Sequence, residues 1–213
     1  MRTPVIVLTF ALLAIVGCGE TSTPLGVKYD IIKETPNTRL SKDTIDIRLS
    51  KKIDERVLGK IATALRRDRK QYDRLWIGYY LPGMVTGKGA WAITHFTPDL
   101  EIRILGTTAE EEKRMVGEAL NHSRVVEGLW LDDRPYVGAT ITLYRENTKL
   151  FLEMKFKDGS GSTDEMTEGA SSNGTKLVEK GGNAHGEYYV LDSKGNLHAG
   201  DSSGIFLKYK KIK

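Results

Sequence analysis

LFLEMKFKDG, residues 150–159, decides the fold of the second half of this chain. Four of its apolar residues share one face of an extended strand: Leu150, Leu152, Met154 and Phe156. The charged residues between them, Glu153 and Lys155, share the other face. A period of two is typical of a strand with one face in a core and the other in solvent. Asp158-Gly159 then favours a tight turn, so the stretch predicts one strand of an antiparallel pair.

The rest of residues 124–213 repeats this pattern of short strands and close turns. The predicted strands are residues 126–131, 140–144, 150–156, 176–178, 186–191 and 205–209. Turn-forming residues separate them: Glu146-Asn147, Asp158-Gly159, Asn173-Gly174 and Lys194-Gly195-Asn196. Short strands joined by close turns predict an antiparallel β-meander that rolls into a half-barrel or closes into a small barrel.

A three-residue motif near the start of this segment adds a resemblance. Gly128-Leu129-Trp130 resembles the G-x-W that opens the first strand of lipocalins and of smaller lipocalin-like domains. The resemblance implies that this glycine and tryptophan close one end of a barrel. It also implies a small apolar ligand inside the meander, with Trp130 among the candidate binding residues.

Residues 41–123 mix helical and strand patterns. Ile45, Ile47 and Leu49 alternate with polar residues, which predicts a strand with Ser50 as the cap of the following helix. An apolar stripe at helical spacing comes next: Ile53, Val57, Leu58, Ile61, Ala62 and Leu65. Strands are predicted at residues 75–81, 91–96 and 100–104, and a helix capped by Thr107 and Glu110 runs to about residue 121. We therefore expect an α+β protein, in which a small N-terminal α/β sandwich precedes the β-meander or small lipocalin-like barrel.

The start of the chain predicts export and lipidation. Arg2 precedes an apolar run at residues 5–16, which is too short for a permanent membrane span and typical of a signal peptide. Ile15-Val16-Gly17-Cys18 resembles the lipobox of bacterial lipoproteins. The resemblance implies cleavage between Gly17 and Cys18, and a diacylglyceryl group on Cys18. Gly19 implies the outer membrane if the organism is Gram-negative. The alternatives are an ordinary signal peptide or a cytosolic protein with an apolar start.

These features divide the chain into a signal peptide (1–17), a lipidated polar tether (18–40), the α/β domain (41–123) and the meander (124–213). Cys18 is the only cysteine, so the exported domain has no disulfide and depends on packing. The formal charge of +4 is a small excess in a chain of this length, and we expect no nucleic-acid partner. The expected partners are the bilayer, through Cys18, and an envelope protein or a small apolar ligand.

Candidate catalytic groups are few. His95, with Asp99 four residues on, could act as a general base or be a half-buried strand histidine. His185-x-Glu187 is followed by His198; if Leu191 pairs with Asn196, Glu187 and His198 share an exposed face that cannot enclose a metal. We assign no catalytic residue, metal or cofactor from the sequence.

Aromatic residues concentrate around the loop after residue 80. Tyr79, Tyr80 and Trp91 could anchor a partner if exposed, or could be core residues if buried. Together with His95 and Trp130 they form the candidate binding set. The sequence thus favours a non-enzymatic envelope lipoprotein with a binding role. An envelope hydrolase using His95 or His185, or a protective surface lipoprotein, are the alternatives.

Overall fold

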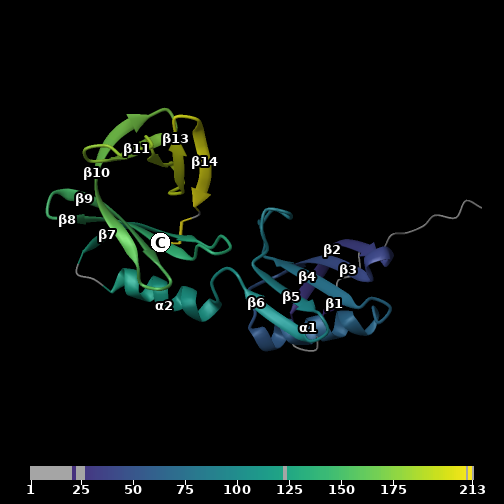
Figure 1. The fold of residues 1–213 in the computed structure, drawn as a ribbon. Coiled ribbons are helices and arrows are strands. Elements are labelled where there is room, and N and C mark those ends of the chain that lie inside the picture. Colours follow the sequence, from purple (N-terminus) through teal and green to yellow (C-terminus); the bar gives the residue numbers. More distant parts are fainter. Residues whose placement is uncertain (1–20, 23–26, 122–123, 210, 213) are drawn as a thin grey trace, which may run out of the picture.

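The structure is a computed structural model that describes residues 21–22, 27–121, 124–209 and 211–212. The lipobox, including Gly17 and Cys18, lies outside the described residues. The described chain is mostly β-structure and forms two sheets, one in each half (Figure 1). None of the described helices has the length and apolar character that crossing a membrane requires.

The N-terminal sheet has six strands in chain order. They are β1 (Thr21–Ser22), β2 (Lys28–Asn37), β3 (Lys42–Leu49), β4 (Arg74–Tyr80), β5 (Ala92–Phe96) and β6 (Leu100–Ile104). Only β3 and β4 pair in parallel, which the predicted strand–helix–strand order requires. The expectation of a tether up to residue 40 is wrong for its second half. Residues 28–40 form β2 and a short 3-10 helix (Thr38–Leu40), because β2 pairs along the edge of β3.

One helix covers this sheet. Helix α1 (Glu55–Arg67) joins β3 to β4 and contacts β5 and β6. Its N-cap is Asp54, whose side chain accepts a hydrogen bond from the Val57 amide, and the predicted cap, Ser50, lies earlier. The predicted apolar stripe is confirmed except for Ile53, which precedes the helix and packs against the same core. The buried side chains of α1 are Val57, Leu58, Ile61, Ala62 and Leu65, and they join the core of the N-terminal sheet.

The second helix belongs to the other half. Helix α2 (Ala109–Leu120) has a capping box made by Thr108 and Glu111, one residue later than predicted. Its sheet contacts are with β7 and β8 of the C-terminal sheet, and Arg114 donates a hydrogen bond to the Lys157 carbonyl there. The predicted α/β sandwich is therefore a six-stranded sheet with α1 as its helical layer.

The C-terminal half is an eight-stranded antiparallel sheet in strict chain order. Its strands are β7 (Val125–Asp132), β8 (Ala139–Glu146), β9 (Lys149–Phe156), β10 (Gly161–Ser171), β11 (Gly174–Glu179), β12 (Tyr188–Leu191), β13 (Leu197–Asp201) and β14 (Gly204–Tyr209). The sheet curls until its last strands stand across from β7 (Figure 1). A bridge between Trp130 and Lys211, and a hydrogen bond from the Ile212 amide to the Leu129 carbonyl, join the two ends. The predicted meander is confirmed.

Trp130 lies on β7 at the bridge that joins the two ends of the sheet. Its side chain is fully buried in the second core, and its indole Nε1 donates to the Gly195 carbonyl at 2.9 Å. Gly128 lies under the indole at a bulge in β7. A Cβ at position 128 would lie 2.2 Å from the ring, so only glycine leaves room for it.

Candidate ligand cavity in the C-terminal sheet

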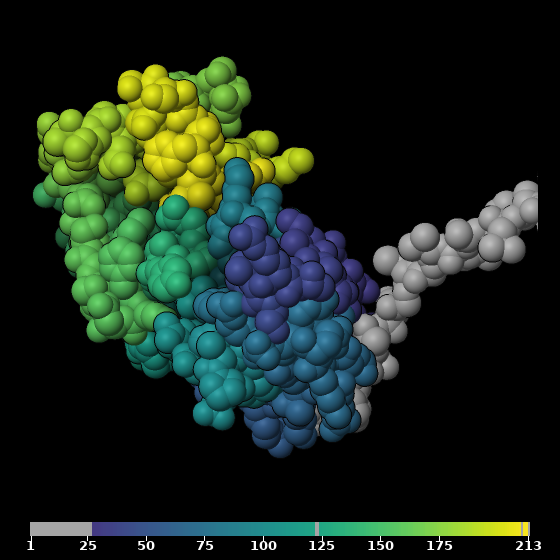
Figure 2. Space-filling model, turned by 45° about the vertical axis from the view of Figure 1, so that its right-hand side comes forward, coloured from purple at the N-terminus to yellow at the C-terminus, as the bar shows by residue number. Residues whose placement is uncertain are grey.

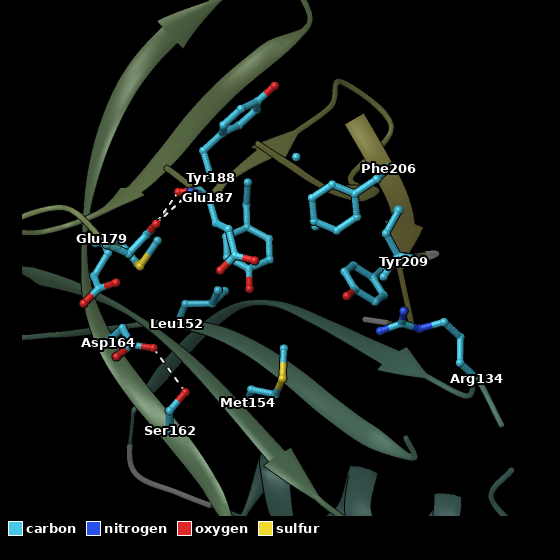
Figure 3. A pocket seen from close by; sticks show the side chains of 16 residues that line it. Arg134, Leu152, Met154, Ser162, Asp164, Glu179, Glu187, Tyr188, Phe206 and Tyr209 are labelled. Atoms are coloured by element: carbon cyan, nitrogen blue, oxygen red, sulfur yellow. Dashed lines mark hydrogen bonds between the residues drawn. The ribbon is translucent and has the colours of Figure 1, made fainter. Parts of the chain in front are cut away.

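The inner face of the curled sheet is not completely filled. A cavity of about 350 Å³ remains between β9–β10 on one side and β12–β14 on the other (Figure 3). Leu152, Met154, Met166 and Ala199 give it an apolar floor. Three aromatic rings stand around this floor, those of Tyr189, Phe206 and Tyr209. The ring of Tyr188 points away from the cavity (Figure 3) and lies beside Lys176. Four charged residues complete the wall: Arg134, Asp164, Glu179 and Glu187.

Strand register places the side chains on this wall. Ser162 lies opposite Met154 and Asp164 lies opposite Leu152 in the β9–β10 pair. Directly opposed residues share a face, so Ser162 and Asp164 point to the same side as the apolar floor. Glu165 points outward and forms ion pairs with Lys149 and Lys180. Neighbouring acids on one strand thus have different surroundings.

The acidic side of the cavity has no basic counter-ion among the residues that the structure describes. Asp164 accepts a hydrogen bond from the Ser162 hydroxyl at 3.1 Å, and the main chain of Glu187 is held by Asn183. Within the described residues, no Lys, Arg or His nitrogen lies within 4.0 Å of the carboxylates of Asp164, Glu179 or Glu187. These three carboxylates therefore depend on water or on a ligand for their charge compensation.

The opposite end of the cavity is neutral overall. Arg134 forms a bidentate pair with buried Asp132, with Nε–Oδ1 at 2.8 Å and Nη2–Oδ2 at 2.6 Å. The hydrogen bond to this carboxylate raises the pKa of Arg134. Burial, and then the negative charge of Asp132, raise the pKa of the Tyr209 hydroxyl far above its usual value. Tyr209 therefore stays protonated, and Arg134 and Asp132 cancel each other.

A second hollow adjoins the cavity. A groove of about 710 Å³ separates the loop at residues 81–89 from the end of β14, and its lining shares Arg134, Leu207 and Tyr209 with the cavity. Figure 2 shows this loop in blue beside the yellow C-terminal segment. Arg48 fixes the loop by donating to the carbonyls of Leu81 and Met84 at 2.8 and 2.9 Å.

Three of the aromatic candidates are core residues and cannot reach a partner. Tyr79 and Trp91 are fully buried and Tyr80 is 5% exposed. The Tyr79 hydroxyl lies 2.9 Å from the Thr94 hydroxyl, and burial raises its pKa. The Trp91 indole donates to the Thr107 carbonyl. These three residues are therefore core residues, as one of the two alternatives expected. Trp130 is also fully buried and is not among the described residues that line the cavity.

The predicted histidines lie apart from the cavity. His95 is on β5, with Nε2 3.5 Å from Glu101 and its ring edge-on to Trp76. Its Nδ1 is buried and has no hydrogen-bond partner among the described residues. His185 is exposed in the loop before β12. Neither histidine lines the cavity or the groove.

The expected pairing at the β12–β13 hairpin is wrong by one residue. Leu191 pairs with Leu197 rather than with Asn196, because Asp192 holds a longer turn by accepting from Asn196 and Lys194. A shift of one residue exchanges the faces of a strand. Tyr189 consequently shares the inner face with Leu197, while His198 faces outward and bonds Asp192 at 2.9 Å. Within the described ranges, no three His, Cys, Asp or Glu residues are grouped to hold a metal.

The sequence analysis singled out Glu187 but did not indicate Asp164 and Glu179, which share the cavity wall with it. Asp164 and Glu179 lie on strands whose inner faces are partly polar, so alternation does not distinguish them from surface acids. Comparison with family models, curated proteins and solved structures finds no match to this chain. The described lining contains no histidine, lysine or cysteine, and combines carboxylates with apolar and aromatic surface. This combination is suited to binding.

Proposed function

We propose that this protein is a lipid-anchored binding protein of the bacterial envelope. Its C-terminal sheet is a small lipocalin-like barrel that holds a small ligand with an apolar part. The observation that carries the proposal is the cavity of about 350 Å³ inside the curled sheet. Ligand sites are concave, mostly preformed and of about 300–1,000 Å³, with a few polar groups on apolar walls. The cavity falls within this size range, and its lining combines apolar and aromatic residues with a larger share of polar and charged ones.

The anchor is supported by the lipobox at residues 15–18. Each buried methylene contributes about 0.8 kcal/mol, so two or three acyl chains hold a protein on a bilayer. Thr21 and Ser22, a few residues after Cys18 in the sequence, already pair with β2 as strand β1. The N-terminal sheet would therefore lie close to the membrane, with the ligand sheet following it in the chain.

Replacing Cys18 by alanine tests the anchor. We expect the variant to move from the membrane fraction to the soluble fraction, because no acyl chain can be attached without the thiol. The measurement is fractionation of cells followed by immunoblotting, with wild-type protein as the control. A variant that remains in the membrane after a carbonate wash contradicts lipid anchoring at Cys18.

Blocking the cavity tests the binding role. Ser162 lies at the cavity wall and is exposed, so Ser162→Trp places an indole in the opening at little cost to the core. We expect saturation-transfer NMR to detect binding of small aromatic amines, alcohols and acids from a mixture to the wild-type protein. We expect Ser162→Trp to lose at least about 90% of this signal, because a ligand site is lost when its volume is filled.

The matched control is Thr163→Trp, which adds the same side chain on the adjacent, outward-facing position of β10. This variant should bind as the wild-type protein does. Binding that survives in Ser162→Trp would place the ligand elsewhere. A wild-type protein that binds no member of the mixture would contradict the proposed function.

A further inference from the structure

We propose that the ligand of this cavity is an organic cation with an apolar body, a primary amine or a quaternary ammonium compound, held by Asp164 and Glu187 and by aromatic rings. This inference rests on the proposed function and specifies its ligand class. Three features of the cavity carry it: its net charge, its aromatic surface and the spacing of its carboxylates.

The charge of the lining is negative. Asp164, Glu179 and Glu187 have no basic partner within 4.0 Å among the described residues. The guanidinium of Arg134, the one arginine in the described part of the lining, is already neutralised by Asp132. Charges of one sign in a concave site with low-dielectric walls concentrate the opposite charge there. The free cavity thus favours a cation over a neutral or anionic molecule of the same shape.

The aromatic surface fits the same class of ligand. Phe206 is 57% exposed, although it is a large apolar residue, and its ring stands over the cavity (Figure 3). Tyr189 and Tyr209 add two further rings to the wall. A cation placed over an aromatic face is attracted by the ring quadrupole, and cages of such rings bind ammonium groups. Core packing does not explain why Phe206 is exposed beside these carboxylates, whereas contact with a bound cation does.

The spacing of the carboxylates argues for a large cation. The carboxylates come from β10, from β11 and from the loop before β12. They surround the apolar floor. Among the described residues, they are not close enough to one another to form a three-ligand metal site. A metal ion needs oxygen ligands at about 2–2.6 Å. An ammonium group with an apolar body can instead contact separate carboxylates while its body covers Leu152 and Met154.

The proton equilibrium of Tyr189 is consistent with this field. Burial raises the pKa of its hydroxyl first, and the negative charges of Glu187 and Asp164 raise it further. The negative potential of these carboxylates therefore extends to the space beside Tyr189, where it would stabilise a cation.

The test compares three probes that share one aromatic body: phenethylamine, phenethyl alcohol and 3-phenylpropionate. Each is titrated into the full protein at neutral pH and low salt, and dissociation constants are measured by NMR. We expect the amine to bind at least about tenfold more tightly than the alcohol, and the acid to bind most weakly. The preference should decrease as salt is added, because ions screen the partly exposed carboxylates.

Two variants and a matched control assign the preference to the cavity. Asp164→Asn and Glu187→Gln should each reduce the ratio of amine to alcohol affinity by roughly threefold or more, with little change for the alcohol. Glu165→Gln removes an acid from the adjacent, outward-facing position and should leave the ratio unchanged.

The outcomes separate the two proposals. Equal binding of amine and alcohol, with both lost in Ser162→Trp, overturns the cation inference and retains the ligand cavity. A preference for the acid overturns the inference as well, as does an amine preference that neither cavity variant changes. If none of the three probes binds, the proposed function and the inference both fail.

Discussion

Trp130→Ala is expected to destabilise the protein by about 3–5 kcal/mol, the range for removing a large aromatic side chain from a core. Trp130 is fully buried among the inner residues of the curled sheet, and its indole satisfies the Gly195 carbonyl. Its backbone also forms the bridge to Lys211 that joins the ends of the sheet. The loss therefore combines a cavity, an unpaired carbonyl and a weaker closure. The free energy of unfolding in urea measures it.

Trp76→Ala is the control, because it removes a side chain of the same size from a partly exposed position. Trp76 is 36% exposed on β4 and packs against His95. Removing it should cost about 1 kcal/mol, near the average for single substitutions. If Trp130→Ala costs no more than Trp76→Ala, the closure of the sheet does not depend on Trp130.

Asp133→Ala is expected to lower the free energy of unfolding by about 2–4 kcal/mol, because it leaves buried donors and a partly buried cation without their acceptor. Asp133 accepts from the amide and the hydroxyl of Thr107 at 2.8 and 2.6 Å, and its other oxygen lies 2.7 Å from Lys52. Lys52 precedes α1, whereas Asp133 follows β7. The carboxylate thus connects the two halves of the chain.

Asp133→Asn separates the contribution of the hydrogen bonds to Thr107 from that of the ion pair with Lys52. The amide oxygen can still accept from Thr107, while the charge facing Lys52 is lost and Lys52 keeps Glu112 at 2.9 Å. We expect its cost to be about half that of the alanine variant, because the acceptor for Thr107 remains. Urea unfolding followed by tryptophan fluorescence measures both. Equal stability of the alanine variant and the wild type would show that the junction is held by other contacts.

Local patterns predicted much of the fold. The buried face of a strand or helix is visible in its sequence when apolar residues repeat at the matching period. This is the case for residues 150–156 and for the apolar stripe of α1, so both elements were predicted. The turns at Asp158-Gly159 and Asn173-Gly174 have positive-φ glycines, as their sequences suggest. The parallel pair of β3 and β4 followed from the helix between them.

Elements without an apolar face were missed. Strand β10 is eleven residues long but buries only Met166 fully, because its inner face lines the cavity and its outer face is in solvent. Strand β2 is an edge strand with mostly exposed side chains, which made it look like a tether. In both cases backbone pairing with a neighbouring strand, which the sequence does not display, forms the element.

The site was harder to predict than the fold. Aromatic residues drew attention to Tyr79, Tyr80 and Trp91, whose large apolar area places them in the core. The acids that line the cavity alternate with acids that form surface ion pairs, as Asp164 does with Glu165. Which of these acids faces the cavity and which faces solvent depends on the register of β9 and β10 and on the curl of the sheet. Both are tertiary properties.

The proposed function requires a small ligand in the cavity inside the curled sheet. Methionine methyl groups report on it directly, because Met154 and Met166 line the cavity whereas Met115 is buried on α2. The measurement is a methyl-¹³C-methionine NMR titration with phenethylamine. We expect saturating shifts of the Met154 and Met166 methyl signals, with the Met115 signal unchanged. Shifts confined to Met115, or no shifts at saturating probe, would contradict it.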